Sequence, residues 1–278
     1  MAHPKVSVRS SRRAAAFWLL LAAYVALTVC VLVWSPVLQL DEYLASLHLK
    51  GHHPAYRPWI FGYAMLGQRG PVTLALLPLF AWLAWRRRSK RPLVLLGTAL
   101  VLLNITVGVV KYAIGRVGPM HVNDSDVHEI FVAGANIYPS GHVSNAVVMY
   151  GLVAWVVAPR FRRLTIGIAV FLSVTVGLST IYLRTHWFSD VLGGWLAGGL
   201  VLLSLPTVLP YAERLADRML DALRRRYARW RTPSRPPRHA ARGAAQPNST
   251  PVRAWAEAHS PAAASVSRER LDEPTRVG

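Results

Sequence analysis

The chain has 278 residues, of which 53% are hydrophobic and only 16% are charged, and several apolar runs reach the length of a membrane span. This composition excludes an ordinary water-soluble domain. The net charge of +19 is partly a property of the arginine-rich carboxyl-terminal end, so we expect a lipid bilayer as the partner and no nucleic acid.

The apolar runs are separated by basic or turn-rich segments, and this alternation predicts six membrane-spanning helices. Residues 1–13 form an amino-terminal arm, and the first run lacks the small-residue exit of a signal peptide, so an uncleaved span is favoured over a cleaved signal. Residues 36–50 mix leucines with Asp41, Glu42 and His48 and are expected to form an interfacial helix. The six expected spans cover residues 14–34, 66–85, 92–112, 142–158, 164–183 and 187–209.

Lysine and arginine are unevenly distributed over the loops that join these spans. The amino-terminal arm, residues 86–91 and residues 160–163 are richer in them than the opposite loops. The positive-inside rule then predicts cytoplasmic termini and an extracytoplasmic active site in a multi-pass cell-membrane protein. The membrane domain would cover residues 14–209. Residues 210–278 are predicted to be a basic, Pro- and Ala-rich cytoplasmic tail without stable structure.

Polar motifs lie at the outer ends of three of the expected spans. His186 and Asp190 are four residues apart, so on a helix they share one face, where the carboxylate orients and polarises the imidazole. A second motif, Pro-Ser-Gly-His at residues 139–142, places Ser140 to cap the helix that follows. An N–H-rich helix start after a Ser-Gly turn is an anion site. Two histidines at two helix starts predict one shared site.

Lys111, the Pro-Ser-Gly-His motif and the His-x-x-x-Asp motif, in this order, resemble the three-part signature of the type 2 phosphatidic acid phosphatase family. The resemblance covers residues 92–209 and the six-span layout. It implies an all-α integral membrane six-helix bundle, related to vanadium haloperoxidases, with an outward-facing active site. Phosphoryl transfer needs positioning and positive charge, so no metal or other cofactor is expected if cations of the chain supply that charge.

The resemblance also assigns roles to individual residues. It implies that His186 is the nucleophile that takes the phosphoryl group, that Asp190 orients it and that His142 protonates the leaving group. The residues that would hold the phosphate oxygens are Lys111, Ser140 and Gly141.

The chain departs from the family signature at two positions. Gly118 and Thr180 stand where the family has phosphate-binding arginines. Arg116 and Arg184 lie close by in the sequence, and an arginine reaches far enough to replace the missing contact from a neighbouring position. An ordinary contact with lipid headgroups is the other interpretation of both arginines.

The expected function is removal of phosphate from a lipid phosphate or a polyprenyl pyrophosphate through a phosphohistidine intermediate. A lipid phosphotransferase with an alcohol acceptor and a catalytically silent phospholipid-binding protein are the alternatives, and the oligomeric state is not predicted. One polar loop is rich in potential metal ligands, but their irregular spacing favours a solvated lid over a metal site. These residues are His121, Asp124, Asp126, His128 and Glu129.

Overall fold

The computed structural model of the chain describes residues 4–47, 54–120 and 129–231. These ranges contain helices and no strand, which confirms the all-α prediction. The elements are α1 (Pro4–Leu32), α2 (Pro36–Ser46), η1 (Pro54–Tyr56), α4 (Arg57–Ala64), η2 (Met65–Gly67), α5 (Arg69–Arg86), α6 (Arg91–Leu103), η3 (Asn104–Gly108), α7 (Val109–Ile114), α8 (Gly141–Val156), η4 (Pro159–Phe161), α9 (Arg162–Tyr182) and α10 (Phe188–Arg231).

Four helical segments of the described chain are long and apolar enough to cross a membrane. They are Ser11–Leu32, Arg91–Ile114, Pro159–Tyr182 and Phe188–Arg231. The apolar helix α8 has only 16 residues, and α5, where a span was also predicted, is not among the four. A membrane protein is therefore confirmed, whereas the count of six spans stays a prediction.

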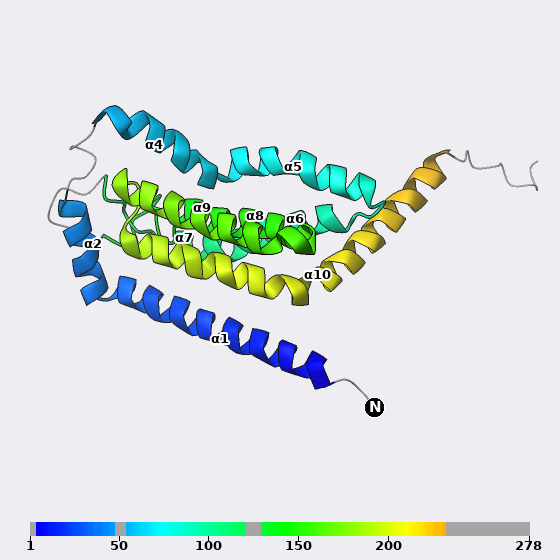
Figure 1. Cartoon of the computed structure of the whole chain (residues 1–278), viewed down its shortest axis with the longest axis horizontal. Coiled ribbons are helices and arrows are strands. Elements are labelled where there is room, and N and C mark those ends of the chain that lie inside the picture. The colour runs from blue at the N-terminus through cyan, green and yellow to red at the C-terminus, as the bar shows by residue number, and fades with distance from the viewer. Residues whose placement is uncertain (1–3, 48–53, 121–128, 232–278) are drawn as a thin grey trace, which may run out of the picture. The chain divides into compact units, whose positions relative to one another are not determined.

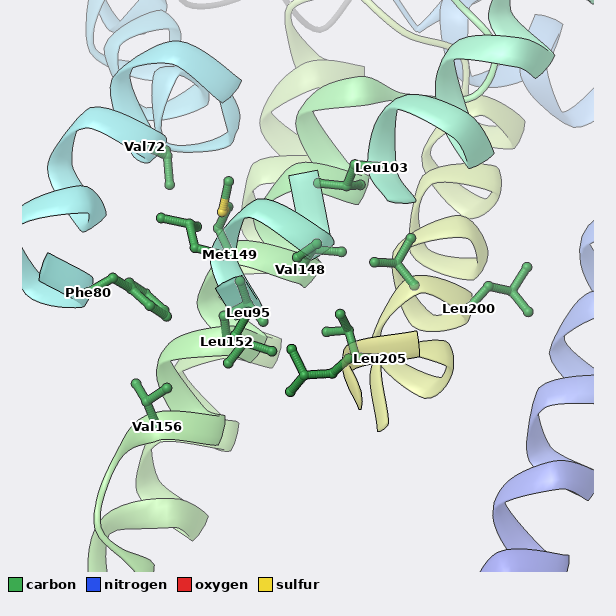
Figure 2. Packing of buried hydrophobic residues seen from close by; sticks show 14 of the residues in the cluster. Val72, Phe80, Leu95, Leu103, Val148, Met149, Leu152, Val156, Leu200 and Leu205 are labelled. Atoms are coloured by element: carbon green, nitrogen blue, oxygen red, sulfur yellow. The ribbon is translucent and has the colours of Figure 1, made fainter. Parts of the chain in front are cut away.

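The core lies where α5, α6, α8 and α10 meet, and α8 is the most buried of these helices (Figure 2). Beyond Asn145 its side chains are apolar on all sides apart from Tyr150, as expected for a helix surrounded by other helices. Figure 2 shows Val148, Met149 and Leu152 of α8 next to side chains of the neighbouring helices, among them Phe80 and Leu205. All five side chains have no exposed surface.

Glycines on α10 let its backbone approach α8 closely. A Cβ atom added at Gly194 would lie 2.8 Å from the carbonyl oxygen of Ser140, and one added at Gly198 would lie 2.7 Å from Cβ of Val147. Small residues are the usual means of close helix packing in membranes. Because Gly194 faces the first turn of α8, this packing brings the starts of α8 and α10 together.

Helix α10 continues well past Leu209, the end of the predicted sixth span (Figure 1). The prediction of a tail without structure from residue 210 was wrong for residues 210–231, which are rich in the helix formers Ala, Leu and Arg. Glu213 and Asp217 pair with Arg91 and Lys90 at the start of α6. Residues 224–231 belong to a separate compact unit, and residues 232–278 lie outside the described chain.

Candidate active site

The first turn of α10 holds the carboxylate of Asp190 in a fixed orientation. Asp190 is the third residue of the helix, and its Oδ2 accepts the backbone N–H of Trp187 at 2.9 Å. A side chain that reaches back in this way satisfies one of the free N–H groups of the first turn, where a negative charge is also favoured by the helix dipole. Asp190 is fully buried. Local helix chemistry therefore aims this carboxylate before any ligand is present.

The two histidines lie together at this point of the fold. Nδ1 of His186 is 3.5 Å from Oδ2 of Asp190, and the His142 and His186 rings are 5.9 Å apart between centroids. The 3.5 Å separation is longer than a normal hydrogen bond, and such contacts often tighten when a ligand binds. With Nδ1 turned to the carboxylate, Nε2 is the nitrogen left for a substrate. The two motifs thus meet as predicted, but His186 precedes α10 by two residues, so the predicted shared helix face of His186 and Asp190 is wrong.

The start of α8 forms a second part of the site. The Ser140 side chain accepts the N–H of Val143 at 3.4 Å, which confirms its predicted capping role. The N–H of Ser140 donates to the carbonyl oxygen of Asp190 at 2.8 Å, so a hydrogen bond joins the starts of α8 and α10. Gly141 follows directly and begins the helix.

Lys111 reaches this helix start from α7. A Cβ atom added at Gly141 would lie 3.5 Å from Cε and 4.0 Å from Nζ of Lys111. The Nζ atom donates to the carbonyl oxygen of Asn136 and, at 3.4 Å, to that of Ile137. An ammonium group beside the free N–H groups of a helix start is a suitable partner for an anion. The structure therefore brings Lys111 and the Pro-Ser-Gly-His motif together.

Arg184 occupies an unusual backbone position at the end of α9. Its φ angle is +57°, a conformation that favours glycine. The N–H of Arg184 donates to the carbonyl of Ile181 at 2.9 Å, and the N–H of Thr185 donates to that of Thr180 at 3.0 Å. These two bonds form a Schellman motif, in which Arg184 takes the place that glycine usually has.

The guanidinium of Arg184 still has capacity to bind a ligand. Its Nε atom is buried and has no hydrogen-bond partner in the described part of the chain, although the residue as a whole is half-buried. A strained residue with an unpaired buried donor, two positions before His186, is a reason to suspect a functional contact.

Arg116 lies in quite different surroundings. Its side chain has no exposed surface, and its guanidinium donates to Asp41 at 2.8 Å, to Asp190 at 2.8 Å and to the Ser189 hydroxyl at 2.6 Å. It also stacks over the Trp187 ring, 5.4 Å from the ring centroid. This placement differs from the predicted phosphate contact of Arg116, because both terminal nitrogens point to buried side chains of the fold, while Nε is buried without a partner in the described chain.

Asp41 is the member of this network that the sequence did not reveal. It was expected on an interfacial helix, but α2 buries it to 1% exposure. Its Oδ1 accepts the N–H of Ser189 at 2.8 Å, so Asp41 caps the first turn of α10 from 148 residues away. Burial raises the pKa of Asp41, and the guanidinium of Arg116 opposes that shift. A carboxylate among leucines was the one available signal, since buried acids need a partner.

The two positions that depart from the family signature also lie near the site. A Cβ atom added at Gly118 would lie 3.0 Å from Cγ1 of Ile137 and 3.6 Å from the carbonyl oxygen of Thr185. Thr180 is buried, and its hydroxyl donates to the carbonyl of Gly177 at 2.7 Å. Neither residue supplies a cation, so any phosphate charge must be met by other groups.

Metal ligands do not gather in the described ranges, where no group of three or more His, Cys, Asp and Glu side chains is found. Most of the polar loop considered as a metal site, residues 121–128, lies outside them. The expectation of a metal-independent site therefore stays a prediction.

Residues 92–214 match the family model of the PAP2 superfamily. The match confirms the resemblance to type 2 phosphatidic acid phosphatases, and it contains both histidine motifs and Lys111.

Two curated proteins are similar to parts of the chain. Phosphatidylglycerophosphatase B of Bacillus subtilis is 34% identical over 67 residues, which are 22% of this chain and 33% of the relative. Lipid A 1-phosphatase of Rhizobium etli is 30% identical over 122 residues, or 42% of this chain and 50% of the relative. The chain thus spans between a third and half of the length of the curated relatives it matches.

The fold also resembles a solved structure. The crystal structure of a transmembrane PAP2-type phosphatidylglycerolphosphate phosphatase from Bacillus subtilis superposes with a TM-score of 0.54 at 21% identity. The likeness covers 69% of this chain and 94% of the other. It supports the arrangement of the helices as that of a transmembrane PAP2 fold.

Proposed function

We propose that this protein is a membrane phosphatase that hydrolyses a lipid phosphate or a polyprenyl pyrophosphate. The observation that carries the proposal is the pairing of His186 with Asp190, 5.9 Å from a second histidine, at the meeting point of two helix starts. A carboxylate-oriented imidazole beside an anion site is suited to covalent phosphoryl transfer. The match of residues 92–214 to the PAP2 superfamily supports the same reaction class.

The proposed reaction has two steps. Nε2 of His186 forms a bond to phosphorus as the bond between phosphorus and the leaving oxygen breaks, and His142 gives that oxygen a proton. Water then attacks the phosphohistidine, His142 takes a proton from the water, and the phosphorus–nitrogen bond breaks to release inorganic phosphate. Asp190 holds the proton on Nδ1 of His186 and stabilises the charge on the ring.

The phosphate oxygens would meet donors from three segments. Lys111, the N–H of Gly141 and the Ser140 hydroxyl meet at the start of α8, and Arg184 lies two residues before the nucleophile. Fixed cations and N–H groups stabilise the charge that spreads over three oxygens during transfer. These groups would supply the charge from the chain itself, so activity is expected to survive a metal chelator.

The identity of the lipid substrate is a further part of the proposal. The names of the two curated relatives make phosphatidylglycerophosphate and the 1-phosphate of lipid A the first substrates to examine. Phosphatidate and polyprenyl phosphates and pyrophosphates complete the set. All of them present a phosphate to a site at the end of apolar helices.

The test is release of inorganic phosphate from these lipids by purified protein in detergent, with chelator present. Wild-type protein is expected to release phosphate from at least one lipid and to form an acid-labile phosphoprotein. Phosphate transfer to an added alcohol without hydrolysis would favour the phosphotransferase alternative. A protein that neither hydrolyses nor transfers would contradict the proposed enzyme and favour a phospholipid-binding role.

The orientation in the membrane is a separate proposal. We infer from the basic loops that the termini are cytoplasmic and that the site faces the outside of the cell membrane. In a Cys30→Ala background, a cysteine introduced at the exposed Ala133 is expected to react with an impermeant thiol reagent in intact cells, and one at the exposed Ser89 is not. The reverse labelling pattern would place the chemistry in the cytoplasm.

A further inference from the structure

A buried ionic network lies behind the histidine pair and connects α2 to the first turn of α10. Arg116 donates from one terminal nitrogen to Asp190 and Ser189 and from the other to Asp41. Asp41 also accepts the N–H and the hydroxyl of Ser189. The side chains of Arg116, Asp41 and Asp190 have at most 1% exposure.

We propose that Asp41 and Arg116 are positioning residues, which hold the carboxylate of Asp190 so that its second oxygen faces His186. Arg116 binds Oδ1 of Asp190, which leaves Oδ2 for Nδ1 of His186 at 3.5 Å. Asp41 in turn fixes the guanidinium and the backbone of Ser189. The inference rests on the proposed phosphatase function, because it assigns a role relative to the nucleophile.

The charges of the network explain why all three members are needed together. Two carboxylates share one guanidinium, and a buried carboxylate without a cation takes up a proton rather than remain charged. With Arg116 present, Asp190 stays ionised and able to polarise the His186 imidazole. Without Arg116, the buried carboxylates of Asp41 and Asp190 would take up protons, and a protonated Asp190 orients the imidazole poorly.

A positioning role of Arg116 and a direct phosphate contact predict different effects on phosphate binding when Arg116 is lost. A phosphate-binding arginine needs donors directed at the substrate, whereas the terminal nitrogens of Arg116 are directed at Asp41, Ser189 and Asp190. Loss of a phosphate contact weakens binding of inorganic phosphate. Loss of a positioning residue lowers the rate of histidine attack and leaves phosphate binding unchanged.

The test compares Arg116→Gln, Asp41→Asn and the double variant with wild type. Turnover, the inhibition constant of inorganic phosphate and the melting temperature in detergent are measured for each. Arg116→Gln is expected to lower turnover on the order of a hundredfold, with a phosphate inhibition constant within about twofold of wild type. The double variant is expected to melt higher than Arg116→Gln, because one buried carboxylate and not two then lacks a cation, and to stay as slow, because Asp190 still lacks its cation.

A matched control uses the ion pair between Lys90 and Asp217, in which the Asp217 side chain is 65% exposed. Lys90→Gln, Asp217→Asn and their double variant are expected to leave turnover and melting temperature unchanged, since exposed pairs contribute little. If Arg116→Gln does not fold, Arg116→Lys replaces it, because an ammonium cannot bridge both carboxylates.

Three results would overturn the inference. These are wild-type turnover in Arg116→Gln, a phosphate inhibition constant raised on the order of tenfold, and a double variant that melts no higher than Arg116→Gln. If wild-type protein itself releases no phosphate, the proposed function fails separately. The melting temperatures then still test whether Arg116 neutralises the two buried carboxylates. This would be contradicted if the double variant melted no higher than Arg116→Gln.

Discussion

Arg116 and Arg184 lie close to the same two histidine motifs, yet their surroundings are opposite. Arg116 is completely buried, and its guanidinium is held by Asp41, Ser189 and Asp190. Arg184 is half-buried and has a backbone conformation that favours glycine, while Nε is buried without a partner in the described chain in both arginines. In the sequence they were equivalent candidates to replace the two missing signature arginines.

The difference shows that proximity to a motif does not decide what an arginine does. An arginine whose terminal nitrogens are held by buried side chains supports the site from behind, while a partly exposed arginine two residues before His186 is available to a ligand. We therefore expect Arg184 to take the place of a signature arginine and Arg116 to act through Asp190. Variants of these arginines and of the two histidines test this division.

His186→Ala is expected to abolish turnover, because it removes the proposed nucleophile, without which neither arginine can support the reaction. No other residue of the three motifs can form the proposed covalent intermediate. Phosphate release and phosphoprotein trapping measure the loss, and a melting temperature in detergent shows that the variant is folded. Residual phosphoprotein in this variant would assign the nucleophile elsewhere.

His142→Ala is expected to lower turnover of lipid phosphates about a hundredfold or more, since a general acid contributes most where the leaving group needs a proton. His142, like Arg184, is expected to act on the substrate directly, because its ring lies 5.9 Å from that of His186. An activated aryl phosphate is the control substrate, and its hydrolysis is expected to suffer much less. Equal losses for both substrates would give His142 another role.

The geometry of the two motifs could be predicted in part, because it follows from local rules. The spacing of His186 and Asp190 indicated their contact, although His186 lies two residues before α10 and not on its face, and Ser140 caps α8 as its position before a helix indicates. Apolar runs of spanning length gave the all-helical membrane fold. These features depend on residues within one or two helical turns.

The remaining features depend on contacts between distant segments, which a single sequence does not contain. Nothing near Asp41 indicates a partner 148 residues away, so its burial against Ser189 could not be foreseen. The positive φ angle of Arg184 was also hidden, because arginine carries no preference for that conformation. The helix from residue 210 to 231 was not predicted, because the charge and composition of residues 210–278 as a whole are typical of a tail without stable structure, although residues 210–231 have high helix propensity.

Arg184→Gly separates the functional contribution of this arginine from its structural one. Glycine suits the left-handed position at the end of α9, so the melting temperature is expected to stay the same or rise. Turnover is nevertheless expected to fall about a hundredfold, as it does when a transition-state donor is lost. Phosphate release, the phosphate inhibition constant and melting in detergent are measured together.

Two further variants serve as controls for Arg184. Arg184→Lys is expected to recover only part of the lost turnover, because an ammonium cannot bind two phosphate oxygens side by side. Arg163→Ala removes an exposed arginine at the other end of α9 and is expected to leave turnover unchanged. Full activity in Arg184→Gly would mean that Lys111 and the start of α8 hold the phosphate without it.

Deleting residues 232–278 is expected to have the smallest effect, with turnover in detergent within about twofold of wild type, because this segment has too few large apolar residues to pack on a bundle. The deletion changes the net charge but removes no arginine near the histidine motifs, so it tests whether fixed cations or overall basic charge drive the reaction. Truncation after Arg231 keeps the ion pairs of Glu213 and Asp217 with the start of α6. If turnover fell on the order of tenfold in detergent, the tail would contribute to the catalytic domain directly, whereas a loss seen only with anionic vesicles would point to lipid attraction by its arginines.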